Sequence, residues 1–209
     1  MPKVIYFYLE VIFLYCLPIF GMWLFTGLLA YRPYLFLFGA LYVFFRGIQA
    51  KKTSRDWGLT TNGWQHDLHQ LNVINLVLPV LAFTTLTFAD PITRIWLIGY
   101  DMLSASLPIR LILYSLVSVP IQEFIFRSYL VWRLEDLKWP TSSIIWTSTI
   151  IFVIGHLPFQ SPLMLVVVAV IGLVYARIYS KHKNIWPIIT SHAIIGSLLM
   201  LIRNYFLPY

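Results

Sequence analysis

Charged residues are scarce in this chain. Asp, Glu, Lys and Arg make up 11% of its 209 residues, while hydrophobic residues make up 59%. Soluble globular domains carry about 25% charged residues. A chain with this composition cannot bury its apolar side chains in a single soluble core, so most of its surface must face lipid. The composition therefore excludes an ordinary soluble domain and predicts an integral membrane protein.

Cysteine is almost absent, since Cys16 is the only one. A single cysteine excludes an internal disulfide framework, and its place in the first apolar run is typical of a small packing residue. That run is much longer than the roughly 7 to 15 apolar residues of a cleaved signal peptide. We therefore expect it to be retained as the first membrane span.

Long apolar runs recur along the whole sequence. A helix needs roughly 20 residues to cross the hydrocarbon core, so the length allows about seven crossings joined by short loops. The expected spans are residues 4–30, 33–48, 70–89, 108–132, 142–158, 162–179 and 185–206. The predicted fold class is all-α, a polytopic membrane helix bundle that forms one integral domain over residues 1–209. Residues 51–70 mix Lys and Trp, and we expect this segment, with Trp57, to lie at headgroup depth.

Loops rich in Lys and Arg alternate along the chain with loops that contain few of them. With the N-terminus inside, the inner side holds Lys3, Arg46, Lys51, Lys52, Arg55, Arg133, Lys138, Arg177, Lys181 and Lys183, and the outer side holds Arg32, Arg94, Arg110 and Arg203. The excess of Lys and Arg on one side predicts an N-terminus inside and a C-terminus outside. The net charge of +7 is then a consequence of topology. We expect the lipid bilayer as a partner and no nucleic acid.

A few polar residues interrupt the apolar spans. They are Gln122, Glu123, Arg127, His156 and His192, with Glu10 in the first span as a weaker case whose partner the sequence does not name. A charged side chain near the bilayer centre costs about 2.5 to 3.5 kcal/mol, so such residues are usually paired or functional. Glu123 and Arg127 are four residues apart and therefore share a helix face. Their spacing fits a structural ion pair and fits a catalytic centre equally well.

The order of these residues resembles a known family. Q-E-x-x-x-R at Gln122 to Arg127, F-x-x-x-H at Phe152 to His156, and His192 on a later span are similar to the motifs of the CAAX protease and bacteriocin-processing family (CPBP, or Abi) of intramembrane endopeptidases. That family usually has E-E-x-x-x-R, F-x-x-x-H and H-x-x-x-N. The resemblance covers roughly residues 118–199, which we expect to be the motif-bearing core.

The resemblance implies a role for each residue. Gln122 takes the place of the first Glu, which in the family activates a water with help from the histidine at the position of His156. Glu123 stands at the position of the second Glu of the motif, and Arg127 stands at the position of its Arg. His192 stands at the position of the last His, which in the family stabilises the oxyanion together with the Asn. This implies a glutamate-type peptide hydrolase without a cofactor, while a zinc site built from Glu123, His156 and His192 stays a less favoured alternative.

The sequence departs from the family twice. Gln122 is a carboxamide and cannot act as a general base, and Gly196 stands where the Asn is expected. Three explanations stay open: Glu123 takes over as the base, Gln122 is a deliberate inactivating change, or the chain is a natural pseudoenzyme.

The predicted function is therefore an intramembrane endopeptidase that cleaves a membrane-associated peptide or C-terminal tail. A catalytically inactive scaffold or binding protein of the same family is the main alternative. A transporter is a third, although Pro120 and Pro158 are only a weak sign of the paired broken helices that transporters use. The short loops are typical of a prokaryotic inner (plasma) membrane protein, and the sequence carries no signal of oligomeric state.

Overall fold

The computed structural model describes residues 3–99 and 106–207, and the regular secondary structure in this part of the chain is all helical, without strands. The α-helices are α1 (Lys3–Val11), α2 (Leu17–Leu24), α3 (Arg32–Gln49), α4 (Trp64–Phe88), α5 (Pro91–Ile98), α6 (Leu107–Leu113), α7 (Val119–Glu123), α8 (Leu130–Asp136), α9 (Thr141–Ile154), α10 (Pro162–His182) and α11 (Trp186–Phe206). Wider π-helical turns, Ile12–Cys16, Tyr114–Ser118 and Phe124–Tyr129, join α1 to α2, α6 to α7 and α7 to α8. Two 3₁₀ turns, Thr26–Tyr31 and Leu157–Phe159, complete the described helices.

Seven helical segments of the described part are long and apolar enough to cross a membrane. They are Val4–Leu24, Thr26–Gln49, Trp64–Phe88, Leu107–Asp136, Thr141–Phe159, Pro162–His182 and Trp186–Phe206. The predicted fold class and the seven spans are confirmed, and the protein is an integral membrane protein. The orientation of the N-terminus and the division into a single domain stay predictions.

The main differences from the expected spans lie around the third and fourth. The third span begins at Trp64, earlier than expected, and the fourth extends to Asp136. Helix α5 follows the third span and was not predicted. It begins at Pro91 because Asp90 caps it, accepting hydrogen bonds from the backbone of Ile92 and Thr93 at 3.0 and 3.1 Å. The hydroxyl and backbone N–H of Thr93 hold the pKa of Asp90 below its usual value.

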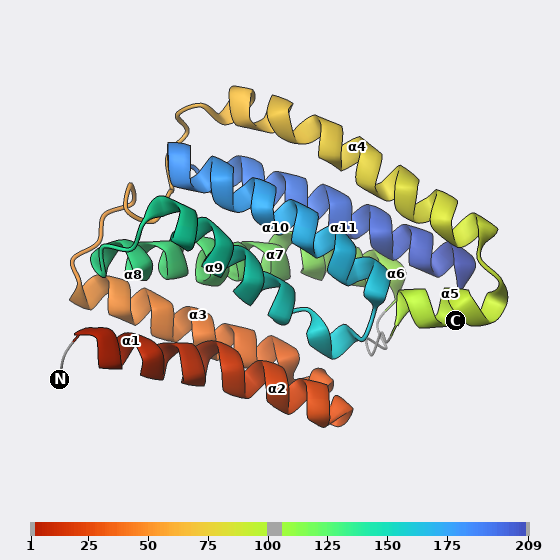
Figure 1. Cartoon of the computed structure of the whole chain (residues 1–209), viewed down its shortest axis with the longest axis horizontal. Helices are drawn as coiled ribbons and strands as arrows, with labels where there is room; N and C mark the ends of the chain where they lie inside the picture. Colours follow the sequence, from red (N-terminus) through yellow and green to blue (C-terminus); the bar gives the residue numbers. More distant parts are fainter. Residues whose placement is uncertain (1–2, 100–105, 208–209) are drawn as a thin grey trace.

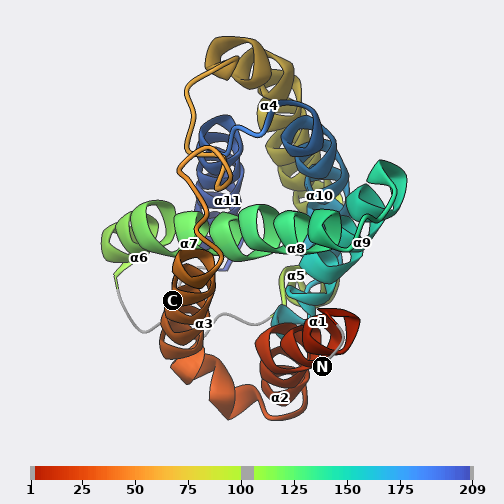
Figure 2. The ribbon, with the colours of Figure 1, turned by 90° about the vertical axis from the view of Figure 1, so that its left-hand side faces the viewer.

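The fourth span crosses the middle of the molecule obliquely. Figure 2 shows α6, α7 and α8 running across the view, whereas the neighbouring helices are seen more nearly end on. Helices α4, α10 and α11 lie on one side of this span, and α1, α2 and α3 lie on the other (Figures 1 and 2). Helices α4 and α11 pack along each other, as do α9 and α10. The segment with Gln122 and Glu123 therefore lies at the centre of the bundle.

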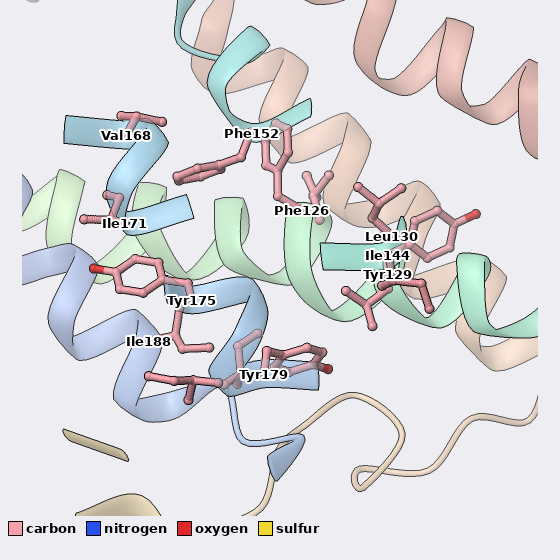
Figure 3. Packing of buried hydrophobic residues seen from close by; sticks show 14 of the residues in the cluster. Phe126, Tyr129, Leu130, Ile144, Phe152, Val168, Ile171, Tyr175, Tyr179 and Ile188 are labelled. Atoms are coloured by element: carbon pink, nitrogen blue, oxygen red, sulfur yellow. The ribbon is translucent and has the colours of Figure 1, made fainter. Parts of the chain in front are cut away.

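The buried core surrounds this central span. Phe126 packs on Phe152 of α9, and Tyr129 and Leu130 lie beside Ile144 of the same helix (Figure 3). The outer helices instead expose large apolar side chains, such as Phe38 at 73% and Phe88 at 86%. Such an exposed apolar surface is expected where a helix contacts lipid rather than water.

The loop between α3 and α4 packs its tryptophan against the fourth span. Trp57 is only 7% exposed and stacks on Phe124, with ring centroids 4.5 Å apart. Gly47 makes this possible, because a Cβ at that position would overlap the indole. Ser128 also donates a hydrogen bond to the carbonyl of Trp57. The loop therefore folds the indole of Trp57 into the protein, and the expectation that this segment lies at headgroup depth stays a prediction.

Glu10 has the partners that the sequence did not name. Its carboxylate accepts from Nε of Arg133 at 2.7 Å, and Nη2 of the same guanidinium also lies 2.7 Å away. The hydroxyl of Tyr42 and Nε of Arg46 donate to its other oxygen at 2.9 and 3.2 Å. One buried carboxylate thus joins α1, α3 and α8.

Candidate active site

Two π-helical turns flank the residues of the first motif. Helix α7 holds Gln122 and Glu123 between the turns Tyr114–Ser118 and Phe124–Tyr129. Pro120 lacks a backbone N–H, so the regular hydrogen-bond ladder cannot be complete across this segment. Wider turns of this kind occur often at functional sites, because they change the direction in which side chains point.

Glu123 lies fully buried between two basic partners. Its Oε1 is 2.7 Å from Nδ1 of His192, and its Oε2 is 3.5 Å from Nε of Arg127. Glu123 and Arg127 are both 0% exposed. The ion pair predicted from their spacing is therefore present, and it is extended by a histidine from the last span.

Arg127 is held from the side opposite Glu123. Its Nη1 donates to Oγ of Ser148 at 3.1 Å, and its guanidinium lies over the ring of Phe152, 4.3 Å from the centroid. Neither Ser148 nor this cation–π contact was predicted from the sequence. A planar guanidinium can bond in its plane and stack on a ring with its face, so both contacts fix the side chain that neutralises Glu123.

The two histidines meet at the ring of Phe152. Helix α9 ends at Ile154, and His156 follows with its Nδ1 2.8 Å from the carbonyl oxygen of Phe152. The centroids of the His156 and His192 rings lie 4.8 and 5.5 Å from that of Phe152. Phe152 of the second motif thus positions both imidazoles, in addition to contacting Arg127.

The helix that carries His192 is fixed by the residue before it. Oγ of Ser191 donates to Oδ1 of Asn75 on α4, and it lies 2.8 Å from the hydroxyl of Tyr175 on α10. These bonds set the rotation of α11 beside His192. Asn75 is a buried amide in the third span, a signal that sequence reasoning did not use.

A cavity of about 150 Å³ lies beside this cluster. Its lining includes Gln122, His156 and His192, but Glu123 is not among the described residues that line it. Nε2 of Gln122 donates to Oγ of Ser118 at 2.9 Å. Gln122 is therefore the residue of the first motif that faces the cavity, while Glu123 lies behind His192.

Further polar side chains line the same cavity. Tyr114, Ser118 and Gln122 follow one another at intervals of four residues, a stripe visible in the sequence that we did not single out. Arg32, Arg110 and Arg203 also contribute to the lining. The cavity is thus rich in hydrogen-bonding groups, although it lies inside a membrane protein.

A second, larger cavity of about 560 Å³ adjoins the first. It lies between the first two spans and the fourth, and its lining is mostly apolar. The two cavities share five lining residues, which are Arg32, Phe36, Phe126, Gly155 and Phe159. The larger cavity thus connects the apolar side of the first two spans with the cavity that holds the polar side chains.

Among the described residues, no group of three His, Cys, Asp or Glu side chains is placed to hold a metal ion. Glu123 and His192 bond each other through Oε1 and Nδ1. The expectation of a site without a cofactor stays a prediction.

Comparison with known proteins gives a match over this part of the chain. The family model described as "Type II CAAX prenyl endopeptidase Rce1-like" matches residues 104–198. The resemblance to the CAAX proteases is therefore confirmed. The match includes Gln122, Glu123, Arg127, His156 and His192, and it points to a membrane endopeptidase of the CAAX protease type. No curated protein and no solved structure gives a match.

Proposed function

We propose that this CAAX-protease-type protein hydrolyses a peptide bond in a membrane-embedded peptide or C-terminal tail. The observation that carries the proposal is the Glu123–His192 pair, which lies beside a cavity whose polar lining residues include Gln122 and His156. The adjoining apolar cavity supports a substrate that arrives from the bilayer.

The base in this proposal is His192, positioned by Glu123. When the carboxylate accepts a hydrogen bond from Nδ1–H, the lone pair of the neutral imidazole is at Nε2. A carboxylate that fixes the tautomer of a catalytic histidine is the arrangement used in Ser-His-Asp hydrolases. Glu123 then acts through His192, which resolves the difficulty that Gln122 cannot accept a proton.

Water would be activated between His192 and Gln122. The side-chain carbonyl of Gln122 accepts one hydrogen bond from the water, because its amide is already directed to Ser118. As the water oxygen bonds to the scissile carbonyl carbon, its proton moves to Nε2 of His192. The same proton passes to the leaving amine when the C–N bond breaks. General base catalysis of this kind contributes about 10² to 10⁴ in rate.

A catalytically inactive binding protein is the second candidate. It is favoured by Gln122 and Gly196, which replace the two residues that the resemblance assigns to water activation and to the oxyanion. In this case the cavity would hold a membrane peptide without cleaving it.

The test is cleavage by purified protein in liposomes. The substrates are a library of membrane-anchored reporter peptides with varied C-terminal tails, and products are identified by mass spectrometry. We expect the chain to cleave at least one tail, and His192→Gln and Glu123→Gln each to lower kcat at least 100-fold. Gln is chosen at position 123 because it keeps the side-chain volume beside Arg127, which Ala would replace with an empty space.

Gln122→Glu separates the remaining explanations. Cleavage only by Gln122→Glu would show that the glutamine disables an otherwise intact protease and that His192 is not the base. Binding of tails without cleavage by any variant would establish the inactive binding protein. Gln65→Glu is the matched control, since Gln65 is exposed on α4 away from the cavity lining, and it should behave as the parent chain.

A further inference from the structure

Gly196 marks a close approach between the fourth and seventh spans. It lies four residues after His192 on α11 and lines the cavity. A Cβ at position 196 would overlap the hydroxyl oxygen of Tyr114. The phenol of Tyr114 therefore occupies the volume that a side chain at position 196 would fill.

In a CAAX-type protease, that volume is where a side chain that stabilises the oxyanion would lie. The resemblance places an amide donor at position 196, one helical turn from the last histidine, where it would stabilise the oxyanion. Gly196 offers no donor. The fourth span instead directs a phenol O–H, which can donate a hydrogen bond just as an amide N–H does.

Tyr114 is placed to reach the reacting atoms. It lines the cavity together with Gln122 and His192, and its ring meets the imidazole of His192 edge to face with centroids 6.0 Å apart. The hydroxyls of Tyr15, Tyr42, Tyr175 and Tyr179 all bond to other described residues. Within the described part of the chain, no such bond is found for Tyr114. Its O–H is thus available to a ligand in the cavity.

We propose that Tyr114 is a catalytic residue that supplies the oxyanion donor which Gly196 lacks. Its O–H donates to the carbonyl oxygen of the scissile peptide while negative charge develops there, and the proton stays on the phenol. This inference rests on the proposed peptidase function. It also accounts for the glycine at position 196, since any side chain there would force the Tyr114 ring to move from its present place.

The experiment exchanges the two donors in the liposome assay. Tyr114→Phe keeps the ring and removes only the O–H, so we expect kcat to fall about 10² to 10³-fold, the usual effect of losing one oxyanion donor. KM should change less than threefold. Tyr114→Ala should lose as much, and Tyr114→Ala with Gly196→Asn should recover at least tenfold over Tyr114→Ala. Tyr34→Phe is the matched control, because Tyr34 is 70% exposed.

The exchange distinguishes catalysis from packing. If Tyr114 has only a packing role, Tyr114→Phe should retain the parental kcat, because Phe fills nearly the same space. That result would overturn the inference about Tyr114 and leave the proposed peptidase function standing. Failure of the double variant to recover activity, while its circular dichroism and peptide binding stay native, would overturn the inference as well. All variants are made with Gln122 and with Gln122→Glu. Cleavage by no protein in either background overturns the proposed function, and with it this inference.

Discussion

The carboxylate of Glu10 offers a test of the fold that does not depend on activity. Replacing Glu10 by Ala removes the acceptor for Arg133, Arg46 and Tyr42 at once. Arg133 is 6% exposed, so its charge would stay buried next to an empty space. The perturbation therefore acts mainly through a buried guanidinium whose remaining carboxylate is Asp136 at 4.0 Å, rather than through lost packing.

The expected magnitude follows from the number of bonds. Removing one partner of a buried ion pair costs about 3 to 5 kcal/mol in soluble proteins. Hydrogen bonds between membrane helices average only about 0.6 kcal/mol each, because the unfolded chain in the bilayer also finds partners. Four contacts at that value set a lower limit of about 2 kcal/mol. We therefore expect Glu10→Ala to lower the free energy of unfolding by about 2 to 5 kcal/mol.

The assay is reversible unfolding in mixed micelles, followed by circular dichroism. Glu10→Gln is the second variant, because it keeps the side-chain volume but removes the negative charge, so it should lose most of the stability that Glu10→Ala loses. A double-mutant cycle with Arg133→Ala isolates the pair, and we expect a coupling of at least about 1 kcal/mol. A loss below about 0.5 kcal/mol, or strictly additive single mutants, would refute the reasoning.

Three further predictions concern packing, metal and topology. Gly47→Ala should destabilise the protein by about 1 to 3 kcal/mol, because its Cβ would overlap Trp57; unchanged stability would contradict this packing. Cleavage should survive EDTA and 1,10-phenanthroline, and its loss with recovery on adding Zn²⁺ would make the protein a metalloenzyme. In a Cys16→Ser background, an impermeant maleimide added to intact cells should label Ile92→Cys but not Ser54→Cys. The reverse pattern would place the N-terminus outside.

The sequence predicts the spans and the composition of the site, because both depend on local signals. The seven apolar runs can be identified in the sequence without knowledge of any tertiary contact. The four-residue spacing of Glu123 and Arg127 is likewise enough to predict their ion pair. The two histidines could be named as site residues because each is a polar exception within an apolar span.

The direction of each side chain could not be predicted in the same way. Adjacent residues of a regular helix point about 100° apart, but π-helical turns on both sides of α7 alter that phase. The sequence alone therefore does not predict that Gln122 faces the cavity while Glu123 bonds His192. Similarly, Glu10 finds Arg133 across more than a hundred residues of chain, and no local pattern encodes such a contact.

The wide turns of the fourth span also affect how the chain tolerates changes in length. A π-helical turn holds one residue more than an α-helical turn does. Deleting the extra residue of Phe124–Tyr129 would return this turn to regular geometry and leave the helix beyond it in nearly the same orientation, so Arg133 would stay beside Glu10. A deletion in a regular stretch of α8 has no such compensation and would rotate everything beyond it by about 100°. In the fourth span, single-residue deletions should therefore be accepted more readily within the wide turns than in the regular helix that follows them.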